Sequence, residues 1–429
     1  MRLKLNKRTF FQIHSWIGIK LSILFFIVCF SGTLAVLSHE MDWLFFSSIR
    51  AIPQEPRASH AEMAANLKET YPNGYVAYWS ASNEPYLCDI AQFVEGKKRY
   101  YVFINPYTAE VQGRASLTFQ RFFRDLHYYL FIPFQVGHFT VLFFGFLLLF
   151  SLITALVFYT KWWNKFLEFK RGRGALVTYR SLHRLVGLWS LPFALLFSIT
   201  GIWYFVERAN VGNVSRIANT SAPKVLNEDI KFLEGDTLQY ELDYERAVAA
   251  AQVEIPDLEV GTISPPLRNT ASIYLTGKSH VPLVRYRANR VYLDPVTYEP
   301  LKVQKAEEIN TITYLNDIAD PLHFGYWGGL PTKILWFLGG LAISGLTLTG
   351  IWIALKRQAK KRSPGKVYGP WRYINWLLVV VMLVFMHGTL VIRYSATWEA
   401  ITIISLVFGL FGCLVWYVFD FKLRRALEE

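Results

Sequence analysis

Residues 13–37 read IHSWIGIKLSILFFIVCFSGTLAVL, and residues 182–206 read LHRLVGLWSLPFALLFSITGIWYFV. In each stretch a glycine stands four residues after a histidine, and a second glycine stands eighteen residues after it. Each stretch carries one formal charge and is long enough to cross a hydrocarbon core of about 30 Å as an α-helix. The two stretches therefore predict membrane-spanning helices that are copies of one another.

Further matches follow in the same order along the chain. Asn105-Pro-Tyr-Thr-Ala-Glu110 matches Asp294-Pro-Val-Thr-Tyr-Glu299, and Asp125-Leu-His127 matches Pro321-Leu-His323. The repeated unit is helix, loop domain, helix, at about 1–160 and 170–356. Both copies are expected to begin and end on the same side, which makes them parallel repeats about an axis along the membrane normal.

The composition supports a membrane protein built on these helices. Hydrophobic residues make up 53% of the 429 residues and charged residues 18%, against roughly 25% charged in soluble domains. This excludes a disordered chain and a cytosolic enzyme, and three cysteines exclude a disulfide framework or a cysteine-rich metal site. Six spans are predicted, at about 17–37, 136–159, 185–206, 334–355, 373–392 and 400–419.

Basic residues predict the orientation of these spans. Lysines and arginines cluster at the N-terminus, after the second span, after the fourth span and in the tail. The positive-inside rule places these segments and both termini in the cytoplasm. It also accounts for the net charge of +13, so no nucleic-acid partner is expected.

The two long loops, 40–133 and 207–332, are then external and long enough to be folded α+β domains. Ser59 and Glu62 form a capping box at the start of one helix, and Asp243 can cap another. The repeated Asn/Asp-Pro-x-Thr-x-Glu motif is typical of a turn between two strands, which favours a structural role over a catalytic one.

The histidines are the candidate functional residues. His14 and His183 stand at the inner starts of spans one and three, whereas His127 and His323 stand at the outer starts of spans two and four. Imidazole is a good iron ligand, and a bis-histidine haem needs two rings from different helices. We predict His14 with His183 as an inner pair and His127 with His323 as an outer pair. His138 and His387 are alternative outer ligands.

Other residues could complete these sites. Gly18 and Gly187 lie one turn after the inner histidines and leave room for a flat macrocycle. Lys20 and Arg184 are candidate partners of the propionates of an inner haem. The alternatives are that the histidines are interfacial anchors or hydrogen-bonded helix residues, and that the two cations simply flank the membrane. The remaining histidines, His39, His60 and His280, are expected at the surface.

With these motifs the chain resembles the PepSY-associated transmembrane family of bacterial inner-membrane proteins. The resemblance rests on the repeated histidine–glycine motifs, the two Leu-His pairs, Trp189 and the two repeated turns. It implies two b-type haems, periplasmic PepSY-like domains and reduction of ferric siderophores. This chain departs from the simplest four-helix pattern by adding spans five and six.

The expected fold is mainly α, a six-helix transmembrane bundle with an internal duplication and two periplasmic α+β PepSY-like domains. The expected function is transfer of electrons from a cytoplasmic reductase or quinol to a ferric siderophore or another periplasmic acceptor. The alternatives are a membrane-anchored sensor or regulatory module and a cytochrome subunit for a partner enzyme. The expected segments are 1–39 (N-terminus and first span), 40–133 (first external domain), 134–160 (second span), 161–182 (basic loop), 183–206 (third span), 207–332 (second external domain), 333–355 (fourth span), 356–372 (basic loop), 373–419 (spans five and six) and 420–429 (tail).

Overall fold

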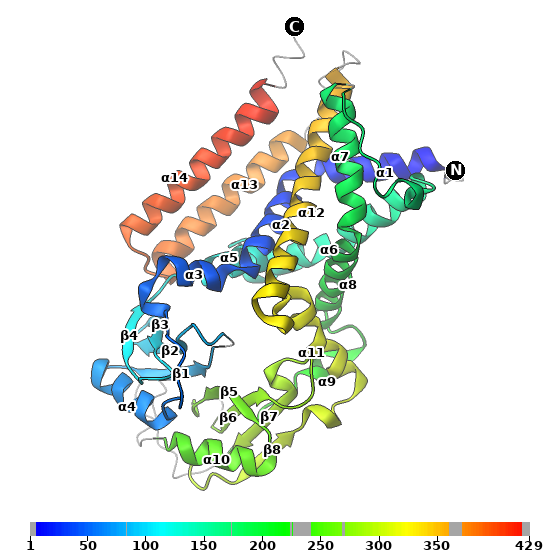
Figure 1. The fold of residues 1–429 in the computed structure, drawn as a ribbon. Helices are drawn as coiled ribbons and strands as arrows, with labels where there is room; N and C mark the ends of the chain where they lie inside the picture. Colours follow the sequence, from blue (N-terminus) through cyan, green and yellow to red (C-terminus); the bar gives the residue numbers. More distant parts are fainter. Residues whose placement is uncertain are drawn as a thin grey trace. The chain divides into compact units, whose positions relative to one another are not determined.

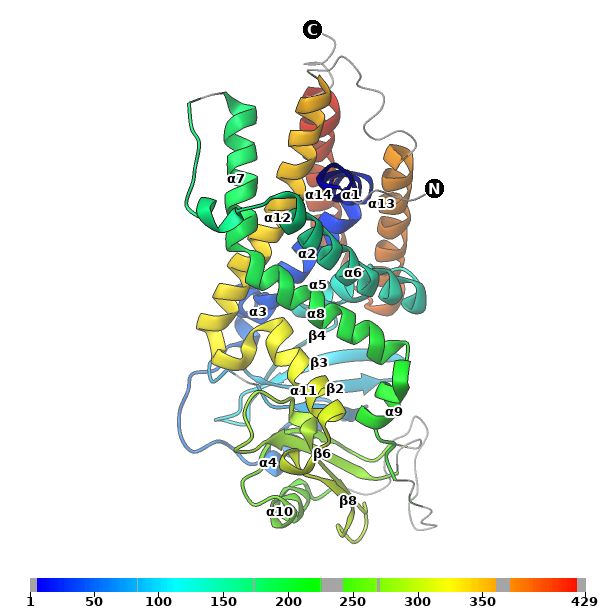
Figure 2. The same cartoon turned by 90° about the vertical axis from the view of Figure 1, so that its right-hand side faces the viewer.

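The computed structural model describes residues 6–82, 84–172, 174–223, 225, 242–267, 271–359 and 371–422 (Figures 1 and 2). The chain forms two compact units. We call residues 1–37, 121–205 and 333–429 the helical unit, and residues 38–120 and 206–332 the sheet unit. Most of the predicted basic loop 356–372 and most of the tail 420–429 lie outside the described residues.

Long apolar helices dominate the helical unit. Among the described residues, four helices are individually long and apolar enough to cross a membrane, and there are up to six candidate spans if each of two bent helix pairs is one span. The chain is therefore a multi-pass membrane protein, as predicted. The helices are α1 (Lys7–Lys20), α2 (Ser22–Val36), α5 (Phe119–Tyr129), α6 (Phe134–Phe158), α7 (Ala175–Trp189), α8 (Leu191–Arg208), α12 (Gly329–Ala359), α13 (Trp371–Gly388) and α14 (Trp398–Val415), with π-helical turns at Thr389–Arg393 and Trp416–Lys422.

Spans one and three differ from the straight helices expected at 17–37 and 185–206. Each begins about ten residues earlier and bends, by 73° between α1 and α2 and by 60° between α7 and α8 (Figure 2). The breaks at Leu21 and Ser190 are equivalent positions of the repeat. Pro192 explains the second break, because proline lacks an N–H and disfavours helical backbone in the residue before it.

The sheet unit contains one antiparallel sheet of eight strands in the order β4-β3-β2-β1-β5-β6-β7-β8. The two predicted external domains are thus joined, because β1 pairs with β5 through Trp79–Ile263 and Ser80–Thr262. No local pattern in the sequence indicates this junction. The strands are β1 (Tyr75–Ser80), β2 (Asp89–Glu95), β3 (Lys98–Ile104), β4 (Val111–Ala115), β5 (Glu259–Ser264), β6 (Ile273–Lys278), β7 (Asn289–Leu293) and β8 (Pro300–Gln304).

Helices α4 (His60–Thr70) and α10 (Tyr244–Glu254) share one hydrophobic core with the sheet (Figure 1). The predicted caps are present: the Ser59 hydroxyl accepts from the amide of Glu62, and Asp243 accepts from the amide of Arg246. The side chains of this core come from both halves of the sheet unit, and the first half adds a smaller cluster of its own around Ile49, Leu87 and Phe103. The remaining helices of this unit are α3 (Ser38–Phe45), α9 (Val214–Ala218) and α11 (Thr311–Phe324).

The repeated turn motif joins β3 to β4 and β7 to β8. Asn105 Oδ1 accepts from the amide of Tyr107 at 3.0 Å, and Asp294 Oδ1 accepts from the amide of Val296 at 2.8 Å. The side-chain oxygen therefore closes each turn, which is the structural role predicted from the sequence.

Candidate functional site

Two histidines of the helical unit face one another. The ring centres of His14 on α1 and His183 on α7 lie 6.5 Å apart, and the ring planes cross at 81°. The edge of the Phe158 ring packs against His14, with 5.5 Å between the ring centres. The structure thus brings together the two residues that the sequence predicted as an inner pair.

Hydrogen bonds fix the tautomer of both rings. Nδ1 of His14 lies 3.0 Å from the carbonyl oxygen of Ser151, which can only accept, so Nδ1 carries the proton. Nδ1 of His183 lies 2.8 Å from the Thr349 hydroxyl, which donates its own hydrogen to the carbonyl of Gly345. Both rings therefore have Nδ1–H and present the lone pair of Nε2, the usual arrangement of metal-ligating histidines.

Sequence reasoning missed Ser151 and Thr349. They lie on α6 and α12, the second span of each copy, so each inner histidine is oriented by the partner helix of its own copy. In the sequence these two acceptors are indicated only by a hydroxyl side chain within an apolar span. This indication is weak, because serine and threonine hydroxyls also bond to the backbone of their own helix.

The glycines near these histidines have different surroundings. A Cβ added to Gly18 would have no described heavy atom within 4 Å, and one added to Gly187 would meet only Leu346, at 3.8 Å. A Cβ on Gly32 would instead lie 2.7 Å from Cε1 of His127. Gly18 thus borders open space beside His14, whereas Gly32 allows the His127 ring to approach α2.

His127 and His138 form a second group in the helical unit. Nδ1 of His127 donates to the carbonyl of Val28 at 2.9 Å, and Nδ1 of His138 donates to the carbonyl of Tyr128 at 3.0 Å. Tyr128, which accepts from His138, follows His127 directly in the chain, so this bond brings His138 beside the end of α5. Both rings have the same tautomer as the inner pair. His323 belongs to α11 of the sheet unit, so its predicted pairing with His127 stays a prediction.

His387 has different surroundings from the other candidate ligands. Its Nδ1 contacts the carbonyl of Leu383 at 2.8 Å, and its Nε2 contacts the Ser405 hydroxyl at 2.8 Å. Both ring nitrogens are engaged, and the second contact joins α13 to α14. This geometry favours a structural role for His387 over a ligand role.

The two predicted propionate partners also differ. Arg184 donates from Nη2 to the carbonyl of Glu168 at 2.6 Å and lies 3.6 Å from its carboxylate, so it holds the loop that precedes α7. Lys20 ends α1 at the bend of span one, six residues after His14. Arg184 thus has a structural task, whereas the role predicted for Lys20 stays a prediction.

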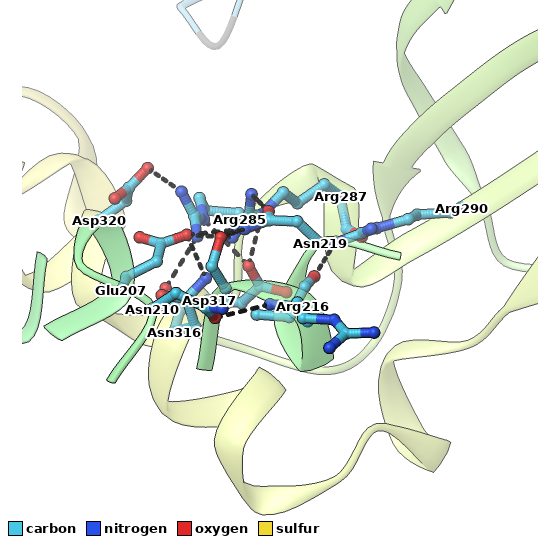
Figure 3. A network of polar contacts seen from close by, with 12 residues as sticks. Glu207, Asn210, Arg216, Asn219, Arg285, Arg287, Arg290, Asn316, Asp317 and Asp320 are labelled. Carbon is cyan, nitrogen blue, oxygen red and sulfur yellow. Dashed lines mark hydrogen bonds and ion pairs between the residues drawn. The ribbon is translucent and has the colours of Figure 1, made fainter. Parts of the chain in front are cut away.

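A buried ionic network fixes α11, the helix that carries His323 (Figure 3). The Asp317 carboxylate is completely buried, and its Oδ1 accepts from Nε of Arg285 at 3.0 Å and from Nε of Arg287 at 2.8 Å. Oδ2 of Asp320 accepts from Nη1 of the same arginine, Arg285, at 2.8 Å. The amide of Asn316 extends the network to Glu207 at the end of α8.

Asp42 of α3 makes a similar contact at the start of α5. Its carboxylate accepts from the backbone amides of Phe119 at 2.6 Å and Gln120 at 3.2 Å. Burial raises the pKa of this carboxyl to about 7 from 3.8, although the two amides act in the opposite direction. His39 lines the same small cavity as Asp42.

We therefore expect the neutral form of Asp42 to stabilise the sheet unit at low pH. This contribution should be complete below about pH 4 and should be lost as the pH rises through about 7, because the folded state binds the proton more tightly. The check is the melting temperature of the wild type minus that of Asp42→Asn, which keeps the cap without the charge. A difference that rises between pH 4 and 7 would contradict the assignment.

Of the three histidines expected at the surface, only His280 is exposed. Its Nδ1 lies 2.7 Å from the Asp257 carboxylate, which raises the pKa of His280. His39 and His60 are half-buried, and the ring of His60 packs edge-on against Trp79. The expectation was wrong for these two, because both are covered by the sheet unit that joins the two loops.

Comparison with known proteins agrees with this architecture. A family model described as the PepSY-associated TM region matches residues 11–357, which include both copies of the repeat. An uncharacterized protein of Pseudomonas aeruginosa is 27% identical over 137 residues, which are 31% of this chain and 34% of that protein. The chain thus spans about a third of the length of this curated relative. The chain belongs to the PepSY-associated transmembrane family.

Proposed function

We propose that this protein is a haem b-binding electron-transfer protein of the bacterial inner membrane that reduces ferric iron at its periplasmic face. The substrate is a ferric siderophore, and the sheet unit forms the periplasmic PepSY-like domains. The observation that carries the proposal is the His14–His183 pair, in which both rings present Nε2 and face one another.

The residues present fit a haem. Two imidazoles that each bind one metal through Nε2 at about 2 Å have ring centres roughly 6 Å apart, and the observed separation is 6.5 Å. The open space beside Gly18 lies one turn from His14, where a flat ring system needs room. His14 and His183 would hold the haem iron, which exchanges one electron when bound.

The positions of the histidines suit electron transfer across the bilayer. His14 bonds to Ser151 of α6, whereas His138 lies near the start of the same helix and bonds to Tyr128, the residue after His127. Thirteen residues of helix separate Ser151 from His138, which is roughly 20 Å at 1.5 Å per residue. Two sites at this spacing divide a hydrocarbon core of about 30 Å into shorter steps.

The chain's own residues would hold and orient the electron carriers. Ser151 and Thr349 keep the proton on Nδ1 of the inner histidines, and Phe158 covers one side of the His14 ring. The sequence has no flavin or nicotinamide motif, so the electrons come from quinol or a cytoplasmic reductase. Reduction to Fe(II) weakens the hold of hard oxygen donors on the metal and releases it from the siderophore.

The function is tested by following the haem absorption bands of dithionite-reduced protein mixed anaerobically with ferric siderophores. We expect at least one ferric complex to reoxidise the protein. If no ferric complex does so while a periplasmic redox protein does, the chain is a cytochrome subunit of a partner enzyme.

The hydrogen bond between the Thr349 hydroxyl and His183 leads to a prediction about haem affinity. Thr349→Val keeps the shape of the side chain and removes the acceptor of His183 Nδ1–H, so we expect haem affinity at the inner site to fall about 10- to 100-fold. Haem titration of the apoprotein measures this loss. Thr347→Val is the matched control, because the Thr347 hydroxyl donates to the carbonyl of Ser344 on its own helix. Equal affinities in the two variants would contradict the role of Thr349.

A further inference from the structure

Spans five and six lie beyond residues 11–357, which match the family, yet they contact the first copy of the repeat at defined points. Helix α13 contacts α2. Helix α14 contacts the same copy through two aromatic pairs, Phe408 with Phe122 of α5 and Phe411 with Phe26 of α2. Figure 1 shows α13 in orange and α14 in red.

At the end of α13 a buried cluster holds α5. The hydroxyl of Tyr394 donates to Oδ2 of Asp125, which also accepts from the hydroxyl of Tyr129 at 3.0 Å. The guanidinium of Arg121 lies 4.1 Å from the centre of the Tyr394 ring. These four side chains are each at most 6% exposed, and α5 carries His127 two residues after Asp125.

The backbone that follows α13 has an irregular conformation on both sides of Tyr394. The π-helical turn Thr389–Arg393 follows α13 directly, and the amide of Tyr394 donates to the carbonyl of Thr389. Ser395 then takes a positive φ of 47°. A π-turn re-aims the side chains that follow it, so the connection between spans five and six is built around this contact.

Near the start of α13 a second contact reaches α1. The side-chain amide of Asn375 donates to the carbonyl of Lys20 at 2.9 Å, and Asn375 is 1% exposed. Lys20 is the last residue of α1, where the bend of span one leaves carbonyl groups without their helical partners. Asn375 thus stabilises the bend that sets the direction of α1, which carries His14.

The second copy is anchored differently. Asp317 stands six residues before His323, and Arg121 stands six residues before His127. Asp317 is held by Arg285 and Arg287, whereas Arg121 packs on Tyr394. The anchor of α11 is therefore supplied by the second copy's own loop, whereas α5, held at its start by Asp42, has a further anchor in the connection between spans five and six.

We infer that spans five and six position the two histidines of the first copy, with Tyr394 fixing His127 through α5 and Asn375 fixing His14 through α1. Both are positioning residues, and their role in haem binding rests on the proposed function. Spans five and six then hold the helices that carry the two histidines. This role does not require His387 to be a haem ligand.

The test compares Tyr394→Phe and Asn375→Leu, with Ser405→Ala as the control. Ser405 contacts His387 within spans five and six. Two properties are measured: amide hydrogen exchange of the protein in nanodiscs, and the electron paramagnetic resonance signal and midpoint potential of each haem. The haem that survives in His183→Ala identifies the outer signal.

Tyr394→Phe should speed exchange at 121–129 roughly tenfold and shift only the outer haem signal. Asn375→Leu should speed amide hydrogen exchange at residues 15–22 to the same extent and shift only the inner haem signal. Ser405→Ala should leave both haem signals unchanged. Equal effects of the two variants at both sites, or exchange rates that stay at the wild-type value, would overturn the inference. A wild-type protein without haem would overturn the proposed function alone, because the exchange measurement needs no haem.

Discussion

His183→Ala is expected to lose one of two haems and to abolish electron transfer across the membrane. The ring of His183 faces His14 at 6.5 Å and is held by the Thr349 hydroxyl, so the variant removes one of two axial ligands. His138, at the level of the proposed outer site, lies roughly 20 Å of helix from Ser151 at the inner site, so under the proposed function the remaining haem would be too far from the donor for fast transfer. The haem content per chain and the rate of ferric siderophore reduction measure the two losses.

The control for this variant is His280→Ala, which removes an exposed histidine of the sheet unit. It should keep both haems and the wild-type rate. His14→Ala should match His183→Ala, because the two rings form one site. Retention of both haems in His183→Ala would show that the facing histidines are only hydrogen-bonded helix residues.

Asp317→Asn is expected to destabilise the sheet unit by about 3 kcal/mol or more. The carboxylate is completely buried and accepts from both Arg285 and Arg287, whose side chains are 18% and 24% exposed. Loss of the negative charge removes the carboxylate that the two arginines share and leaves Arg285 with Asp320 and Arg287 with Glu207 at 3.7 Å. Such a break within a buried network costs far more than the loss of a surface ion pair.

Denaturant unfolding measures this loss, and hydrogen exchange at 311–324 locates it. The matched control is Asp257→Asn, which removes the carboxylate of an exposed pair with His280 and should change the stability little. Equal stabilities of the two variants would contradict the structural importance of the network in Figure 3.

Much of the architecture followed from the sequence because long apolar stretches have few alternatives in a membrane. All six predicted spans correspond to helices or bent helix pairs, and the repeat placed His14 and His183 at equivalent positions. The caps at Ser59 and Asp243 were also predictable, because a side-chain oxygen three residues before an unpaired amide is a local signal.

Features that depend on distant contacts were not predictable. The β1–β5 pairing joins residues 79 and 263, and no local pattern specifies which strand edges meet. The break at Leu21 has no proline, and the side chain that bonds to its backbone, Asn375, lies in a different span. The acceptors Ser151 and Thr349 could not be distinguished from other hydroxyl residues of the spans.

The central claim is that facing histidines in the helical unit hold haem, and an absorption spectrum of the purified protein tests it most directly. Protein from haem-replete cells, in oxidised and dithionite-reduced forms, should show sharp b-type bands of bis-histidine haem at two haems per chain. A colourless protein would contradict the account and would leave a membrane-anchored sensor or regulatory module as the better description of the chain.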